Sequence, residues 1–258
     1  MQLTHTDYLL WAVSTGLQAV LFAVMAWTRF YRRLPYFSLY VAIVLAADAY
    51  LWYAYHKYGF ASAASFTLAW SLQGITLGPR GLAVGELCRR ALSPYRGVWA
   101  LAWRLLTGAA ILLLVYAGLA SYSSRTRVAT FILTAERGLE LAAAVLLLLL
   151  LAISHYYRIE ILVPERLLIY GLCAWSLVQV LNDVAWQVLA SRYFQWANKI
   201  HVISYQVTVA VWIYAVLRPV TAEQPQPAMN AALYNRVAPA VNVRLQALNN
   251  RLLEIFKG

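Results

Sequence analysis

The chain has 258 residues, a formal net charge of +11 and a hydrophobic share of 62%. Charged residues make up only 12%, which is about half of their share in a soluble domain, and the mean hydropathy is +0.61. This composition excludes a soluble globular protein. The apolar runs are long and continuous rather than alternating in strands of about ten residues, which excludes a membrane β-barrel. The sequence therefore predicts an all-α polytopic membrane protein.

Seven apolar runs have the length of a membrane-crossing helix, since about 20 helical residues span a hydrocarbon core of about 30 Å. In chain order they cover residues 8–27, 35–55, 60–77, 98–120, 129–154, 167–190 and 196–217. We therefore expect a bundle of seven transmembrane helices in residues 1–218 and a tail in residues 219–258. The first run lacks the basic start and cleavage site of a signal peptide, and basic residues follow it directly.

The third run is interrupted by Gly78-Pro79-Arg80-Gly81. Because proline removes a helix hydrogen bond, either the helix ends at Leu77 and residues 82–92 form a surface helix, or one kinked helix continues to Arg90. Both alternatives place Arg80 near the cytoplasmic face. The same holds for Glu86, which is spaced to pair with Arg89 or Arg90.

Basic residues are distributed unequally between alternate connections, as the positive-inside rule requires of a membrane protein. The residues on the richer side are Arg29, Arg32, Arg33, Arg89, Arg90, Arg96, Arg158, Arg166, Arg218, Arg236, Arg244, Arg251 and Lys257. The other side holds Lys57, Arg125, Arg127, Arg192 and Lys199. We expect the N-terminus outside and the C-terminus in the cytoplasm, and we attribute the net charge to this topology rather than to nucleic-acid binding.

Polar residues at membrane depth are the candidate site, because a charge at the centre of a spanning helix costs at least about 2.5–3.5 kcal/mol. Helix rise places most of them in the outer half of the membrane. The candidate ligand-binding residues are Asp48, Gln73, Glu136, Arg137, Glu140, Gln179, Asn182, Asp183, His201 and Tyr205.

The spacing of these residues sharpens the prediction. Glu136 and Glu140 are four residues apart and share a helix face, and Arg137 is placed to neutralise Glu140. Polar and aromatic residues also recur at three and four positions in the sixth and seventh runs. Such stripes line a common interior, so we expect Glu136, Asp183 and His201 to meet in one cluster.

Several interpretations of this cluster stay open. It is either a buried network that fixes helix packing or a cavity, open to the outside, that binds a small polar or cationic ligand. A metal site ranks below both, and no metal or catalytic residue is assigned. No known cofactor is implied, because Lys199 lies too near a helix end for a retinal protein. Cys88 and Cys173 are expected to be buried hydrophobes.

The tail combines a linker at residues 221–227, which holds two prolines, with an amphipathic segment. Val241, Leu245, Leu248 and Leu252 recur at three and four positions and continue to Ile255 or Phe256, which is typical of one apolar helix face. Asn249, Asn250, Arg251, Glu254 and Lys257 take the other face. We expect this helix to lie on the lipid bilayer, dock on a protein partner or self-associate.

The first functional hypothesis is a receptor-like or ligand-binding protein that acts through its cytoplasmic face and tail. The alternatives are a small-solute or proton-coupled transporter and a non-catalytic subunit of a larger membrane complex, and no feature identifies an enzyme. Because only three of the basic residues are lysine, which is typical of GC-rich bacterial coding, we expect a multi-pass protein of a bacterial inner membrane.

Overall fold

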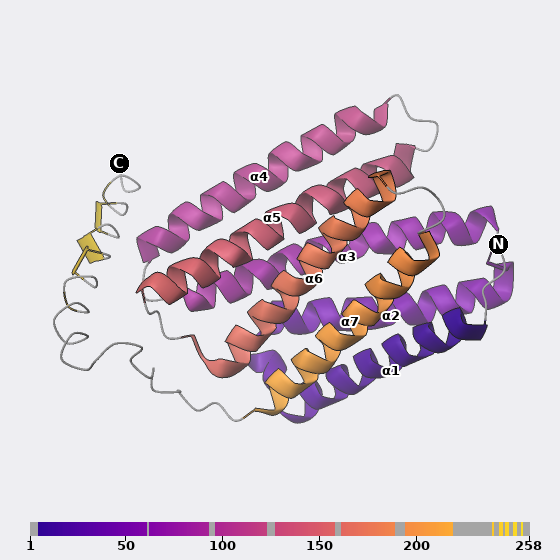
Figure 1. The fold of residues 1–258 in the computed structure, drawn as a ribbon, viewed down its shortest axis with the longest axis horizontal. Coiled ribbons are helices and arrows are strands. Elements are labelled where there is room, and N and C mark those ends of the chain that lie inside the picture. Colours follow the sequence, from indigo (N-terminus) through magenta and orange to yellow (C-terminus); the bar gives the residue numbers. More distant parts are fainter. Residues whose placement is uncertain are drawn as a thin grey trace.

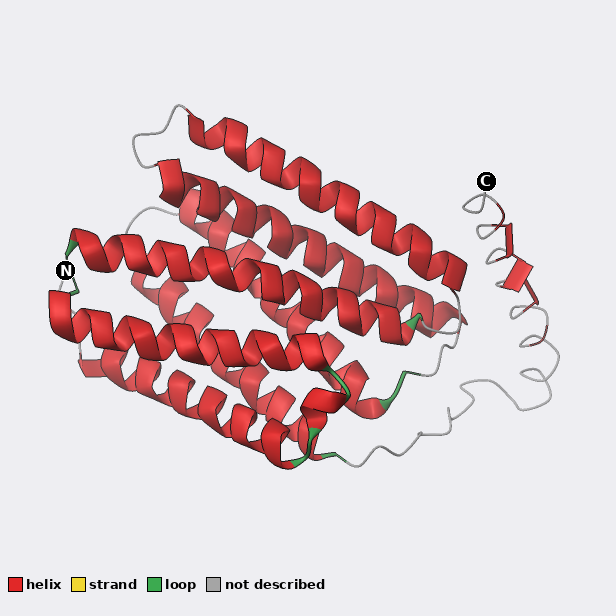
Figure 2. Cartoon of the chain, turned by 180° about the vertical axis from the view of Figure 1, so that it is seen from behind, coloured by secondary structure: helices red, strands yellow, loops and turns green. Residues whose placement is uncertain are grey.

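The structure is a computed structural model that describes residues 5–60, 62–92, 96–122, 127–157, 161–188 and 194–218, with scattered residues between 239 and 254. Within these residues the chain forms seven α-helices and one 3₁₀ turn, with no strand (Figure 2). The elements are α1 (His5–Trp27), η1 (Phe30–Arg32), α2 (Pro35–Tyr58), α3 (Ala63–Ala91), α4 (Arg96–Tyr122), α5 (Arg127–Tyr157), α6 (Val163–Val188) and α7 (Phe194–Leu217). The all-α prediction is confirmed.

Five of the described helices are long and apolar enough to cross a membrane: α1, α2, α4, α5 and α7. The multi-pass class is therefore supported, whereas spans by α3 and α6 stay a prediction. Polar side chains interrupt the apolar sequence of both helices. Gln73, Arg80 and Glu86 interrupt α3, and Gln179, Asn182 and Asp183 interrupt the second half of α6.

The third apolar run gives the largest difference between the expected and observed elements. α3 does not end at Leu77 but passes through Pro79 and continues to Ala91, which agrees with the second of the two alternatives. Pro79 lacks the N–H that would bond the carbonyl four residues earlier. Neighbouring helices make such a position tolerable in a membrane protein, and α3 packs against both α2 and α5.

Six helices form a closed ring in the order α1, α2, α3, α5, α6, α7, with α7 packing back on α1. Gln206 of α7 closes the ring through its side-chain amide, which donates to the carbonyl of Leu10 at 2.9 Å and to the hydroxyl of Ser14 at 3.2 Å. α4 lies outside the ring at one edge of the bundle, where it packs mainly on α5 (Figure 1). Leu112 and Leu119 of α4 are 71% and 72% exposed, as lipid-facing residues would be.

Successive helices run in opposite directions, so their ends gather at two opposite ends of the bundle (Figure 1). We call the end that holds η1 the basic end. Its described Arg residues are Arg29, Arg32, Arg33, Arg89, Arg90, Arg96, Arg166 and Arg218. The described Lys and Arg residues of the opposite end are Lys57, Arg127 and Lys199. The charge asymmetry of the sequence is therefore an asymmetry of the folded bundle.

Local chemistry accounts for the turns between the first three helices. Gly59 has a φ of 80° and follows the last residue of α2, a backbone conformation that glycine adopts without strain. Ser62 then caps α3, its hydroxyl oxygen accepting the N–H of Ser65 at 3.1 Å. At the basic end, α2 begins with Pro35, and the N–H of Phe37 donates to the Glu86 carboxylate at 2.9 Å.

The predicted tail helix falls mostly outside the described residues. Val241, Leu245, Leu248, Leu252, Ile255 and Phe256, which make its apolar face, are not described, and neither is the linker at 221–227. Asn250, Arg251 and Glu254 are helical and exposed. This agrees with their predicted place on the polar face, and the docking role of the helix stays a prediction.

Candidate functional site

The buried charges of the bundle meet between α3 and α5. Arg80 forms an ion pair with Glu140, and their side chains are only 14% and 2% exposed. At 1.5 Å per residue, Glu140 lies about 20 Å along α5 from Arg127. The guanidinium of Arg80 also lies 5.6 Å from the ring centre of Tyr40 on α2. A cation held over an aromatic face in this way gains further stabilisation.

This pair corrects two expectations. We expected Arg80 at the cytoplasmic face and Arg137 as the partner of Glu140, yet Arg80 lies inside the bundle and supplies the ion pair itself. α3 continues through Pro79 and packs against α5, and this packing brings Arg80 to the carboxylate of Glu140. Arg137 is half-buried and has an interaction partner.

A second polar link joins the same two helices. The side-chain amide of Gln73 donates to the carboxylate of Glu136, four residues before Glu140. The predicted common face of Glu136 and Glu140 is thus turned toward α3, and both carboxylates are buried. Each acidic group has a partner of its own, as burial in an apolar environment requires.

A third group gathers around Tyr205 of α7. Tyr205 interacts electrostatically with Asp48 and Tyr40 of α2 and with Arg80 of α3, and its hydroxyl makes a polar contact with Gln18 of α1. Gln18 also contacts the carboxylate of Asp48. Tyr205 is therefore the point at which polar side chains of α1, α2 and α3 meet α7.

The rings of α6 and α7 complete this arrangement. The Trp175 ring centre lies 4.7 Å from that of His201 and 4.8 Å from that of Tyr205. Among the described residues, the indole N–H of Trp175 and the Nδ1 of His201 have no hydrogen-bond partner, and neither does the amide oxygen of Gln18. Trp175 and Gln18 are only 4% and 3% exposed. Buried polar atoms of this kind require water or a ligand to complete their hydrogen bonding.

We refer to these side chains together as the polar interior. Its members are Gln18, Asp48, Gln73, Arg80, Glu136, Glu140, Trp175, His201 and Tyr205. All six helices of the ring contribute to it, and α4 does not. Of the candidate residues from the sequence, Gln179 and Asn182 are half-buried on α6, and the side chain of Asp183 lies outside the described part. The predicted meeting of Glu136, Asp183 and His201 is therefore untested.

Gln18, Arg80 and Trp175 were missed as site residues. Gln18 carried a usable signal, because it is a single amide inside the apolar first run. Trp175 carried none, since tryptophan is common in membrane helices. Arg80 was left out because its position at the end of the third run placed it near the cytoplasmic face rather than at membrane depth.

The apolar core occupies the part of the ring nearer the basic end, and we call it the inner core. Its largest fully buried side chains are Leu21, Met25, Leu34, Phe37, Tyr40, Leu87, Leu147, Leu168, Ile169, Leu172 and Trp212. They come from the halves of the six ring helices nearer the basic end and, in the case of Leu34, from the residue before α2. Polar groups thus lie toward the opposite end of the ring, and tight apolar packing closes the basic end.

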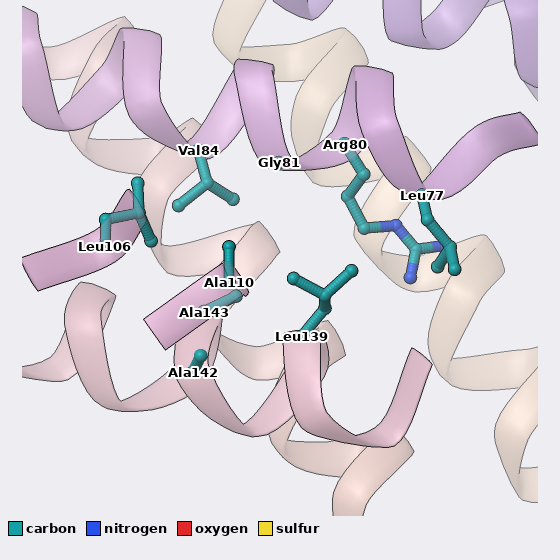
Figure 3. Close-up of a pocket in the computed structure, with 9 residues that line it drawn as sticks. All are labelled: Leu77, Arg80, Gly81, Val84, Leu106, Ala110, Leu139, Ala142 and Ala143. Atoms are coloured by element: carbon teal, nitrogen blue, oxygen red, sulfur yellow. The ribbon is translucent and has the colours of Figure 1, made fainter. Parts of the chain in front are cut away.

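A small cavity of about 30 Å³ lies beside Arg80, between α3, α4 and α5 (Figure 3). Leu77, Val84, Leu106 and Leu139 are among the side chains that line it. Its volume is enough for one or two water molecules. Since Arg80 is its sole charged lining residue, this cavity is not a separate binding site.

The basic end carries an ionic cluster of its own. Glu165, in the first turn of α6, pairs with Arg33 at 3.0 Å and with Arg90 at 3.2 Å. Arg90 also donates to the backbone carbonyl of Arg33. Glu86 accepts the N–H of Phe37 at the start of α2 and also interacts electrostatically with Arg90 and Arg89, the residues that the sequence spacing indicated. The cluster therefore ties η1, α3 and α6 together.

No group of three or more His, Cys, Asp or Glu side chains forms a possible metal site in the described ranges. Cys88 and Cys173 are both buried and free. A scan against protein-family models finds no match, and searches of curated proteins and of solved structures find no significant similarity.

Proposed function

We propose that this protein is a receptor-like, ligand-binding protein of a bacterial inner membrane, with seven spans, the N-terminus outside and the C-terminus in the cytoplasm. In this arrangement the basic end faces the cytoplasm, in agreement with the positive-inside rule. The ligand enters from outside and binds in the polar interior. The response is passed to the basic end and its tail.

One observation carries this proposal: the ring is polar in its outer half and tightly apolar in its inner half. Asp48, His201 and Tyr205 are only partly buried, whereas Leu147, Leu168 and Leu172 of the inner core are 0% exposed. A polar interior with partly exposed side chains at one end and tight apolar packing at the other favours ligand binding over passage through the membrane. The charge of the polar interior favours a cation, since its carboxylates outnumber its one arginine.

A continuous set of contacts leads from the polar interior to the basic end. Tyr205 interacts with Arg80, and Arg80 lies over the ring of Tyr40. Tyr40 and Phe37 both pack against Trp212, with ring centres 6.4 Å and 5.2 Å apart. Phe37 then meets Glu86 at the start of α2. These contacts support a response at the basic end, and coupling would require two arrangements of this set with different ligand affinities.

The orientation and the open outer half are tested together by thiol labelling in intact cells. Single cysteines replace Phe60, Asn182, Arg32 and Ala144 in a Cys88→Ala, Cys173→Ala background. We expect a membrane-impermeant thiol reagent to label Phe60→Cys at the outer end and Asn182→Cys in the outer half. It should not label Arg32→Cys at the basic end or Ala144→Cys, whose parent residue is 1% exposed.

Each outcome of this experiment has a distinct meaning. Labelling at Arg32→Cys but not at Phe60→Cys would reverse the orientation. Labelling at Phe60→Cys but not at Asn182→Cys would show that the outer half is closed, and the ligand-binding proposal would fail.

A transporter is the second candidate, and the Arg80–Glu140 pair favours it. Ionisable residues inside a membrane protein mark ion and substrate pathways, and this pair lies where the polar interior meets the inner core. A transporter must open the inner core in a second conformation. Purified protein in proteoliposomes should then let Ala144→Cys react from the basic end while substrate is supplied, whereas a receptor should keep it protected.

A further inference from the structure

We infer that the ligand of the polar interior is a small primary amine in its ammonium form, bound by Asp48 and Gln18 beside the rings of Tyr205 and Trp175. The inference rests on the proposed function and names the class of ligand that the site accepts. It follows from the hydrogen-bonding capacity, the charge and the ring faces of these side chains.

The hydrogen-bond acceptors around Tyr205 are suited to a ligand that provides N–H donors. The amide of Gln18 contacts Asp48 and Tyr205, yet its Oε1 atom has no partner among the described residues although the side chain is buried. Asp48 has no ion pair with a Lys or Arg of the described chain. A primary ammonium group offers three N–H donors and one positive charge, so it can serve the Gln18 oxygen and the Asp48 carboxylate at once.

The charges of the other side chains in the polar interior also favour a cation bound at Asp48. Glu140 is paired with Arg80, and Glu136, which accepts from the amide of Gln73, also interacts electrostatically with Arg80. Asp48 is therefore the carboxylate near Tyr205 that has no directly bound cation in the described chain. Since an isolated charge in an apolar environment is costly, a bound cation compensates it.

The aromatic side chains favour an organic amine over a metal cation. The rings of Tyr205 and Trp175 pack against each other with their centres 4.8 Å apart and their planes tilted by 56°, and His201 packs on the same indole. Ring faces attract cations and also cover the carbon atoms of an alkylammonium. The unpartnered indole N–H of Trp175 further calls for an acceptor on the ligand, which a hydroxyl group supplies. Ethanolamine carries both features and is the probe that we choose.

The experiment measures binding of radiolabelled ethanolamine to the purified full chain in detergent at pH 7, at constant ionic strength. We expect saturable binding that ethylamine displaces more weakly, and that tetramethylammonium and sodium do not displace. Asp48→Asn and Gln18→Leu should each weaken binding at least about tenfold, as expected for the loss of a hydrogen bond to a charged group. Trp175→Phe should lower the affinity for ethanolamine to the affinity for ethylamine.

Thr107→Val on α4, outside the ring and exposed, is the matched control and should bind as the parent protein does. Gel filtration of each variant establishes that it is folded. If Asp48→Asn fails to fold, the binding affinity of Gln18→Leu tests the inference instead. Absence of ethanolamine binding, equal displacement by tetramethylammonium or sodium, or unchanged affinity in folded Asp48→Asn would overturn the inference. Labelling of Asn182→Cys from outside does not depend on these results, so the proposed function and the ligand class fail separately.

Discussion

Removing Arg80 tests whether the buried ion pair organises the bundle. Arg80→Met leaves Glu140, whose side chain is 2% exposed, without its cation. The carboxyl can then become neutral, and protonating a carboxyl of ordinary pKa about 4.3 at pH 7 costs about 3.7 kcal/mol, since each pH unit is worth about 1.36 kcal/mol. This cost is the upper limit of the loss in unfolding free energy, and it lies within the range of about 3–5 kcal/mol for breaking a buried pair.

The same reasoning gives the loss a pH dependence with a defined sign. In Arg80→Met the folded state holds a proton on Glu140 that the unfolded state releases above its ordinary pKa. The variant is therefore relatively more stable at low pH and loses stability as pH rises. At pH 5 the deficit should fall to about 1 kcal/mol. Glu140→Met removes the carboxyl, so its deficit should not shrink in this way.

The assay is equilibrium unfolding by SDS in mixed micelles, followed by helix content at pH 5 and pH 7. The double variant Arg80→Met, Glu140→Met should lose much less than the two single losses added together, because apolar side chains can replace a buried pair at little cost. Arg32→Met, at an exposed position of η1, should stay within about 0.5 kcal/mol of the parent protein. A deficit for Arg80→Met that is equal at both pH values, or additive losses in the double variant, would refute the reasoning.

Two further predictions use the same unfolding assay. Gly171 packs directly against the indole of Trp212, so Gly171→Ala should lower stability by about 1–3 kcal/mol through overpacking, whereas Gly16→Ala, whose added methyl would meet nothing, should not lower it. Glu165→Gln should cost about 1.5–3 kcal/mol by weakening charged hydrogen bonds to Arg33 and Arg90, and less at high salt. A loss below about 0.5 kcal/mol would show that this cluster does not hold η1 to α6.

The apolar runs predicted the helices well because the signal is local. The first run ends at Trp27 and the second begins at Pro35, as α1 and α2 do. A run of apolar residues and its flanking charges reflect the bilayer thickness, which acts on each helix separately. For the third run the sequence left two alternatives open, and the structure agrees with the continuous helix. Whether a helix continues past Pro79 depends on what the neighbouring helices offer, and one helix's sequence does not contain that information.

The sequence did not predict which side chains pair between different helices, for a related reason. The four-residue spacing of Glu136 and Glu140 correctly indicated a shared face, but not which helix that face meets. The ring order places α3 beside α5 and leaves α4 outside, although α4 is the neighbour of both along the chain. The local partner Arg137 was therefore the natural choice for Glu140, and the true partner is 60 residues away at Arg80.

The uncharged residues of the candidate site were also missed by an analysis that treated each helix separately. A search for charges at membrane depth finds Asp48, but it passes over Gln18 and Trp175, whose side chains carry no charge. Their importance comes from convergence, since separate helices bring both to Tyr205. A buried amide or indole with an unfilled hydrogen bond is costly in each helix alone. Their occurrence together at one point of the ring supports the proposed ligand, and the binding experiment with Gln18→Leu and Trp175→Phe separates a shared ligand from helix packing.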